Sequence, residues 1–260
     1  MRERLNRYWR VFGTGSSFAL FGLGGVLLWL VAFPILALAV RDPARRSRVA
    51  RRWVHRCFGA FMEYMRRVGV LTYEVVGRER LQREGLLVLA NHPTLIDVVF
   101  LVSLLPNADC VVKTRLARNP FTRGPINATG YVSNESGSGL VQDCVASVAG
   151  GSTLVIFPEG TRSPFQGGLQ PFQRGAANIA VRGRIDVTPV LIRCTPPTLR
   201  KGEKWYRVPP RRFHIAVEVL PDLPVEPFLT DTPEPLAARK LTDHLAHFFE
   251  TELARARAGT

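Results

Sequence analysis

The sequence predicts an α/β protein with a mixed, largely parallel sheet flanked by helices and preceded by a hydrophobic membrane segment. After Gly69, short apolar runs alternate with helix-like stretches, which is the pattern of buried strands joined by helices. Before Gly69, Ser17 to Val40 carry no charge and exceed the roughly 20 residues that a helix needs to cross a hydrocarbon core. We therefore divide the chain into an N-terminal membrane-anchoring part, residues 1–68, and a sheet domain, residues 69–260.

The apolar segment has three possible interpretations. A cleaved signal peptide is disfavoured, because the run is longer than an ordinary signal core and a strongly basic stretch follows it. A single membrane span would place the larger arginine cluster, after residue 40, in the cytoplasm. Glycines and Pro34 inside the run also allow a hairpin of two half-buried helices, so both topologies stay open.

Residues Ala44 to Val68 are predicted to form a basic amphipathic helix at the membrane interface. The predicted apolar face consists of Val49, Trp53, Cys57, Phe61, Met65 and Val68, with arginines on the other face. The alternative is a surface helix packed on the core. The net charge of +14 favours anionic lipid over nucleic acid as partner, because much of it borders the apolar run and no nucleic-acid motif is present.

The sheet domain begins with an alternating strand and continues with buried apolar runs. Strands are expected at residues 71–76, 86–90, 110–112, 152–157, 188–192 and 213–220. Helices are expected at residues 97–105, 140–148, 176–181 and 236–256. The four cysteines are scattered without ligand spacing, so we expect reduced structural thiols and no metal site.

The segment NHPTLID, residues 91–97, follows the second predicted strand. Pro93 suits the first position of a helix, which places His92 at the end of the sheet and Asp97 about one turn into the helix. The helix N-terminus would keep the imidazole neutral, and Asp97 would fix its tautomer. This predicts His92 as a general base oriented by Asp97. Alone the spacing is weak, since an N-cap histidine and an unrelated aspartate give the same pattern.

A second segment, FPEGTRS at residues 157–163, also follows an apolar strand. Gly160 lets backbone amides approach an anion, Thr161 adds a donor, and the Arg162 guanidinium can bind a phosphate through two hydrogen bonds. Glu159 would anchor the arginine or bind an acceptor hydroxyl. A turn with a surface arginine is the alternative when this segment is taken alone.

Together, and in this order, the two segments resemble the motifs of the glycerolipid (lysophosphatidic acid) acyltransferase family. Residues 169–176 and 187–192 resemble two further blocks of that family, and the likeness covers roughly residues 70 to 220. The resemblance implies a metal-free site that moves an acyl chain from a thioester to a hydroxyl without an acyl-enzyme. It implies His92 and Asp97 as catalytic residues, and as substrate-binding residues Asn91, Lys113, Glu159, Gly160, Thr161 and Arg162.

One block departs from the family pattern. The family has a conserved lysine, matched by Lys113, followed by a segment whose arginine contacts the acceptor phosphate. Residues 130–135 read GYVSNE, with no arginine and with a carboxylate at Glu135. Arg123 and Arg174 are candidates to replace it. The departure puts the acceptor in doubt rather than the chemistry.

The resemblance further implies that no cofactor is needed beyond the co-substrate, which is acyl-CoA or acyl carrier protein. It places the protein in the bacterial inner membrane with the site facing the cytoplasm, and makes 1-acylglycerol-3-phosphate the first candidate acceptor. The opening residues also resemble acyltransferases of aryl-polyene pathways, which favours another hydroxylated lipid as the alternative. A non-catalytic membrane-binding protein is disfavoured by the intact His92 and Asp97. A serine hydrolase is disfavoured because GxSxG is absent.

Overall fold

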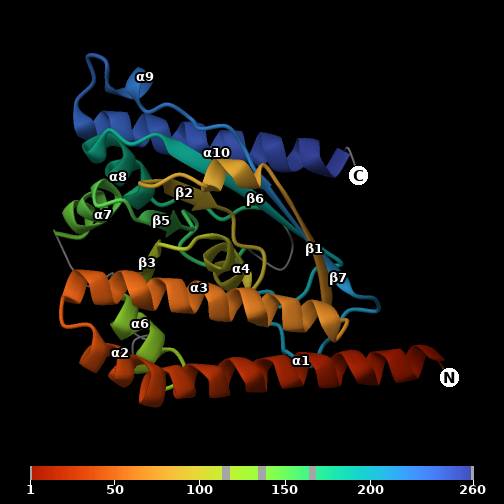
Figure 1. Cartoon of the computed structure of the whole chain (residues 1–260). Helices are drawn as coiled ribbons and strands as arrows, with labels where there is room; N and C mark the ends of the chain where they lie inside the picture. Colours follow the sequence, from red (N-terminus) through yellow and green to blue (C-terminus); the bar gives the residue numbers. More distant parts are fainter. Residues whose placement is uncertain (1, 113–117, 134–138, 164–167, 259–260) are drawn as a thin grey trace.

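The protein is described by a computed structural model covering residues 2–112, 118–133, 139–163 and 168–258. A central sheet separates two layers of helices (Figure 1). Helices α3 (Pro43–Arg67) and α4 (Asp97–Leu104) cover one face. Helices α7 (Leu140–Ala149), α8 (Gly175–Gly183) and α10 (Glu234–Ala258) cover the other. The layered arrangement confirms the predicted fold class.

In the described part of the chain the sheet has seven strands in the order β1-β7-β6-β2-β5-β3-β4. All neighbouring pairs are parallel except β6 and β7, which are antiparallel. The strands are β1 (Leu71–Val76), β2 (Leu87–Ala90), β3 (Ala108–Val112), β4 (Val132–Ser133), β5 (Thr153–Ile156), β6 (Val187–Thr195) and β7 (Phe213–Val219). All but β4 were predicted.

Shorter helical elements join these layers. They are η2 (Arg78–Leu81), α6 (Arg123–Thr129) and α9 (Glu226–Leu229). Their sequences contain too few turns to show a helical period, so none was predicted.

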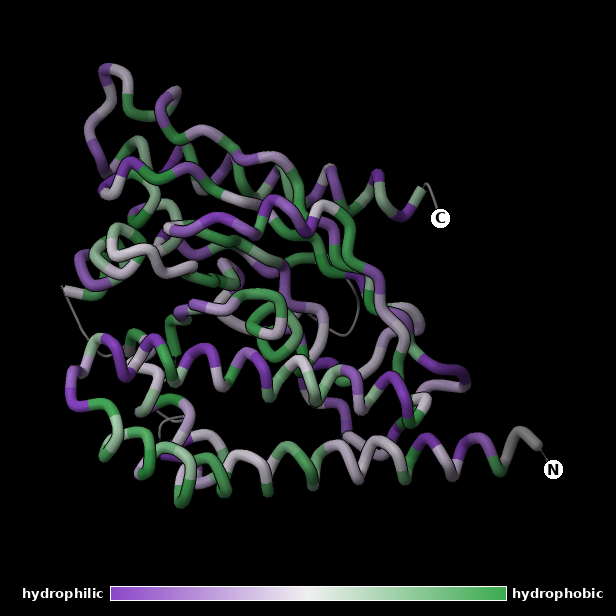
Figure 2. Tube along the Cα trace, in the orientation of Figure 1, coloured by the Kyte–Doolittle hydropathy of each residue, from purple (hydrophilic) through white to green (hydrophobic). Residues whose placement is uncertain are grey.

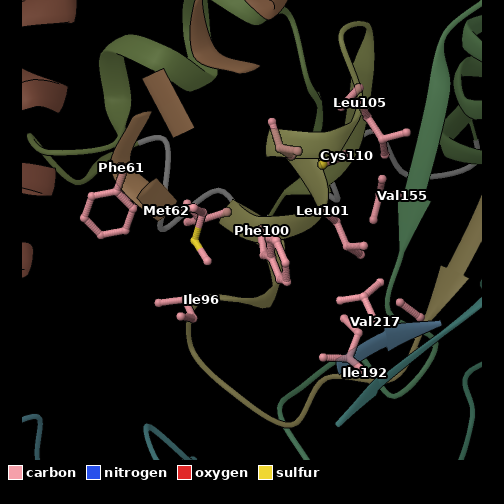
Figure 3. Packing of buried hydrophobic residues seen from close by; sticks show 14 of the residues in the cluster. Phe61, Met62, Ile96, Phe100, Leu101, Leu105, Cys110, Val155, Ile192 and Val217 are labelled. Carbon is pink, nitrogen blue, oxygen red and sulfur yellow. The ribbon is translucent and has the colours of Figure 1, made fainter. Parts of the chain in front are cut away.

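Helix α4 forms the centre of the larger core cluster (Figure 3). Phe100 is 1% exposed and packs edge-on against Tyr73 of β1, with ring centroids 5.0 Å apart. Burying a side chain of this size stabilises the fold by about 1.5–3 kcal/mol. The cluster joins α3 and α4 to the sheet through Phe61, Met62, Leu101, Val155, Ile192 and Val217. The His92 loop, between β2 and α4, is therefore attached to a rigid support.

The N-terminal part is a long helical segment, α1 (Arg2–Leu27), a π-helical turn η1 (Leu28–Ala32) and α2 (Phe33–Ala39). The π-turn precedes Pro34, which has no N–H to donate, and Phe33 N donates to Leu28 O five residues back. Among the described residues, Leu5–Ala39 is the one helix long and apolar enough to cross a membrane. Figure 2 shows a hydrophilic start of α1 and an apolar remainder.

This apolar helix also contacts the rest of the protein. Trp9 Nε1 donates to Val68 O (2.9 Å), and Tyr64 Oη donates to Ser16 Oγ (2.9 Å). Gly25 approaches the backbone of Phe121 so closely that a Cβ there would collide with the Phe121 carbonyl oxygen. Much of α1 is thus held along α3 and the region before α6.

The predicted helix at residues 44–68 is confirmed as α3, but its predicted apolar face is wrong in part. Cys57 is exposed, whereas Arg51, assigned to the basic face, is 9% exposed. The helix turns Ala50, Val54 and Met62 toward the sheet domain instead. This packing matches the alternative of a helix on the core; a membrane role for its outer face, and a domain boundary at residue 68, stay predictions.

A buried polar network explains the position of Arg51. Its NH2 group contacts Asp109 Oδ2 of β3 (2.9 Å), NH1 donates to Ser152 Oγ (2.7 Å), and Nε donates to Thr129 O (3.0 Å). Asp109 is 1% exposed and also accepts from Ser147 Oγ. The arginine is buried because it meets a buried carboxylate, which the helical period alone does not reveal.

Candidate active site

His92 lies in the loop between β2 and α4, at the carboxyl end of the central strand β2. Helix α4 begins at Asp97, which confirms the start of the predicted range 97–105; Pro93 lies before the helix, and Asp97 is its first residue and not a residue one turn in. Asp97 is therefore the acidic residue of the first turn, where it also suits the helix dipole. Residues 91–96 form an irregular loop that folds back over this carboxylate.

His92 and Asp97 are in contact: Nδ1 lies 2.9 Å from Oδ2. Asp97 is 0% exposed, while His92 keeps 15% exposure. An ionised carboxylate only accepts hydrogen bonds, so this contact leaves Nδ1 as the donor and Nε2 as the free acceptor. The geometry is that of a base held in one tautomer by a buried acid.

Thr94 completes the surroundings of Asp97 and has no assigned role in the sequence analysis. Its backbone N–H donates to Oδ2 (2.6 Å), and its hydroxyl donates to Oδ1. Three donors thus converge on the two carboxylate oxygens, an arrangement that suits the charged form. The signal in the sequence is a threonine three residues before an aspartate that starts a helix, a spacing at which side chain and backbone hydrogen-bond locally.

Glu159 joins the two motif segments. Its Oε1 accepts from the backbone N–H of His92 (3.0 Å) and from Ser163 Oγ (3.0 Å), and its Oε2 accepts from Gln170 N (2.9 Å). Ser163 N in turn donates to His92 O (2.8 Å). Glu159 is 3% exposed, and in this structure it orders the loops instead of anchoring Arg162.

Asn91 is fixed to the neighbouring strand. Its amide donates to Ile192 O (2.8 Å) and its carbonyl accepts from Ile192 N (2.7 Å), so both ends of the side chain are engaged with β6. With 3% exposure and both ends of its side chain bonded to β6, Asn91 positions the His92 loop in this structure. Its substrate-binding role stays a prediction.

The second segment lies beside His92. The Phe157 ring packs on the imidazole with centroids 4.3 Å apart. Gly160 adopts φ +64°, a conformation that favours glycine. Gly160 is exposed, and the next residue, Thr161, is half-buried. These two residues stand where the chain turns away from β5, near the base, and their substrate-binding roles stay predictions.

Arg162 binds backbone carbonyls in this structure, and its predicted substrate-binding role stays a prediction. Its NH1 group donates to the carbonyl oxygens of Leu199 and Arg200, each at 3.0 Å. Burial lowers the pKa of this guanidinium, and the nearby Asp97 carboxylate acts in the opposite direction. In this structure Arg162 therefore holds the connection between β6 and β7 in place.

Arg123 and Arg174 were the candidates to replace the arginine missing from residues 130–135, and that role stays a prediction for both. Arg123 is exposed and lies over the Trp29 ring, 5.2 Å from its centroid. Arg174 is exposed at the start of α8. Lys113 and Glu135 fall outside the described residues. Within the described ranges, no cluster of three histidine, cysteine or acidic side chains is placed to hold a metal ion.

A buried acid, an oriented histidine and an adjoining glycine loop at a strand end form an arrangement that can accept a proton at Nε2 of His92. The sequence model of the family described as Acyltransferase matches residues 72–193. A Caenorhabditis elegans protein, acl-2, provisionally named as a 1-acyl-sn-glycerol-3-phosphate acyltransferase, is 32% identical over 191 residues. That match covers 67% of this chain and 63% of the relative.

A Helicobacter pylori protein named 1-acyl-sn-glycerol-3-phosphate acyltransferase is 30% identical over 41% of this chain and 47% of its own length. The chain thus spans less than two thirds of these curated relatives. The crystal structure of PlsC from Thermotoga maritima, a 1-acyl-sn-glycerophosphate acyltransferase, shares the fold with a TM-score of 0.68. It is 20% identical, and the match covers 97% of this chain and 98% of that one.

These matches show that the chain contains an acyltransferase domain similar to those of the 1-acyl-sn-glycerol-3-phosphate acyltransferases. This similarity and the apolar N-terminal helix together indicate that the protein is membrane-associated.

Proposed function

We propose that the protein is an O-acyltransferase of phospholipid biosynthesis, moving a fatty acyl group from a thioester to the hydroxyl of a lysophospholipid-type acceptor. The observation that carries this proposal is the 2.9 Å contact between His92 Nδ1 and the fully buried Asp97. It leaves Nε2 as a base on the partly exposed side of the loop.

In the proposed reaction, the acceptor hydroxyl gives its proton to Nε2 of His92 as its oxygen attacks the thioester carbonyl carbon. The C–S bond then breaks, and the departing thiolate takes the proton from the imidazolium. Asp97 stabilises the charged imidazolium between these two steps. A positioned general base typically contributes about 10²–10⁴-fold, and the remainder comes from orientation and from donors to the oxyanion.

The first candidate acceptor is 1-acylglycerol-3-phosphate, because relatives carry that substrate in their names. Acyl-CoA and acyl carrier protein are the candidate donors, and no metal or further cofactor takes part. A different hydroxylated lipid is the second candidate acceptor, favoured by the missing arginine in residues 130–135.

We place the protein at the bacterial inner membrane, with the site facing the cytoplasm and the basic N-terminal region against anionic lipid. The apolar run is one continuous helical segment, Leu5–Ala39, and not the two half-helices of the predicted hairpin. The contacts of α1 with α3 and with Phe121 support a helix that lies against the protein in one leaflet over a lone span. Bilayer lipids are then both anchor and source of acceptor.

The decisive experiment measures thiol release by purified protein in detergent, with and without added acceptor. Release should require the acceptor, and His92→Ala should reduce it by at least about 10²-fold. His247→Ala, an exposed histidine on α10, is the matched control and should stay near wild type. Near wild-type turnover in His92→Ala, or release without acceptor, would contradict the proposal.

A further inference from the structure

A cavity of about 640 Å³ lies beside the His92 loop. Asn91 and Pro93, the two neighbours of His92, line it, together with Ser163 of the second motif. From there it extends under the C-terminal end of α10, where Leu253 and Arg257 form part of the lining. The cavity thus runs from the two neighbours of the candidate base to a region that neither motif describes.

The cavity lies on the α10 face of the sheet, opposite α4. Its lining includes Glu74 of β1, whose neighbour Tyr73 packs against Phe100 of α4. Since successive side chains of a strand point to opposite faces, Glu74 points toward the α10 side.

The lining is strongly basic. Five of its residues are arginines, whereas Glu74 is its single carboxylate among the lining residues described. The arginines come from β6, from the β6–β7 connection and from α10: Arg193, Arg200, Arg211, Arg212 and Arg257. Residues far apart in the sequence are brought together, so this charge is not a local run.

Hydrogen bonds to backbone carbonyl oxygens shape this basic wall. Arg193 donates to the Ala256 carbonyl of α10, and Arg162 binds the Leu199 and Arg200 carbonyls. Carbonyl acceptors leave the charge of a guanidinium intact. A concave surface with several arginines and few carboxylates raises the local concentration of anions and binds phosphate oxygens through paired N–H groups.

We propose that this cavity is a phosphate-binding site, holding a phosphate group of one of the two substrates while the reacting group lies at His92. The proposal rests on the proposed function and names the part of the substrate that this site recognises. The phosphate belongs either to the acceptor headgroup or to the nucleotide end of a coenzyme A donor. Arg162 acts here as a positioning residue, because it fixes the connection that carries three of the five arginines.

Binding is tested apart from turnover, in the full-length His92→Ala background. The probes are glycerol 3-phosphate and coenzyme A without an acyl chain, with binding followed by calorimetry in detergent. Arg211→Gln/Arg212→Gln should weaken binding of one probe on the order of ten- to a hundredfold. Arg207→Gln, an exposed arginine of the same connection outside the lining, is the matched control and should leave binding unchanged.

Loss of glycerol 3-phosphate binding, with a raised acceptor KM in the otherwise wild-type enzyme, assigns the site to the acceptor. Loss of coenzyme A binding, with a raised donor KM, assigns it to the donor. If neither probe is affected, or if Arg207→Gln has the same effect, the proposal is overturned. Arg211→Lys/Arg212→Lys keeps the positive charge without the planar guanidinium and should retain part of the affinity. This variant is the control for loss of binding through misfolding. An otherwise wild-type protein that binds the probes but releases no thiol would contradict the proposed function and leave the proposed phosphate site standing.

Discussion

Replacing Arg51 with methionine should strongly destabilise the protein. The change removes the cation from a network in which Asp109 is 1% exposed and Arg51 is 9% exposed. Breaking a buried ion pair on one side costs about 3–5 kcal/mol, because the remaining charge stays buried without its partner. Chains of this size lose roughly 2–4 °C of melting temperature per kcal/mol, so the midpoint should fall by roughly 6–20 °C.

The measurement is thermal unfolding in detergent, followed by tryptophan fluorescence. Arg52→Met, the exposed neighbour on the same helix, is the control and should stay within about 0.5 kcal/mol of wild type. Arg51→Met/Asp109→Asn should recover part of the loss, since the stranded charge is gone. If Arg51→Met behaves like Arg52→Met, the network does not hold α3 to the sheet.

Three further predictions concern the site, the membrane and pH. Asp97→Asn should lower kcat by about 10²–10⁴-fold with little change in KM, because the amide still accepts from Nδ1 without stabilising the imidazolium; unchanged kcat in steady-state assays would contradict the pairing. Leu23→Asp/Leu27→Asp, at positions 69% and 61% exposed, should weaken flotation with vesicles, whereas Leu236→Asp on α10 should not; equal flotation of both would exclude α1 as anchor. Hydrogen bonds from Arg83, and secondly from Thr188, lower the pKa of the Asp222 carboxyl. These bonds therefore stabilise the folded protein fully at a pH above the ordinary pKa of a carboxyl, and the stabilisation is lost as the pH falls through the lowered pKa of Asp222. Asp222→Asn should therefore be less stable at pH 7 and approach wild type in strong acid in denaturant titrations; a gap that widens in acid would refute this.

The sheet was predictable from sequence because its central strands are buried on both faces and appear as continuous apolar runs. Strand β2, with four fully buried residues, is the clearest case. Strand β4 was missed because Val132 and Ser133 are too few to show any period. The antiparallel pairing of β7 with β6 was also not predicted, since nothing within the seven residues of β7 encodes the direction of the neighbouring strand.

The candidate site was predictable to the extent that its groups are neighbours in sequence. His92 and Asp97 lie five residues apart, and a loop of that length lets them meet. The hydrogen bond that the backbone N–H of His92 donates to Glu159 joins two loops. Every residue type except proline has this donor, so the sequence does not mark the partner of Glu159. The cavity arginines could not be grouped, because only the antiparallel pairing of β6 and β7 and the placement of α10 bring them together.

The place of β1 in the sheet has a consequence for synthesis on the ribosome. The strand is made early, yet it pairs with β7, and the partners Thr72 and His214 are 142 residues apart. At about 5–20 residues per second, β1 waits roughly 7–28 s for its partner. During that interval its unpaired edge is open to strands of neighbouring nascent chains, while α1, made before β1, is already available to the bilayer. Early capture of α1 by the membrane would keep nascent chains dispersed until the last strand arrives.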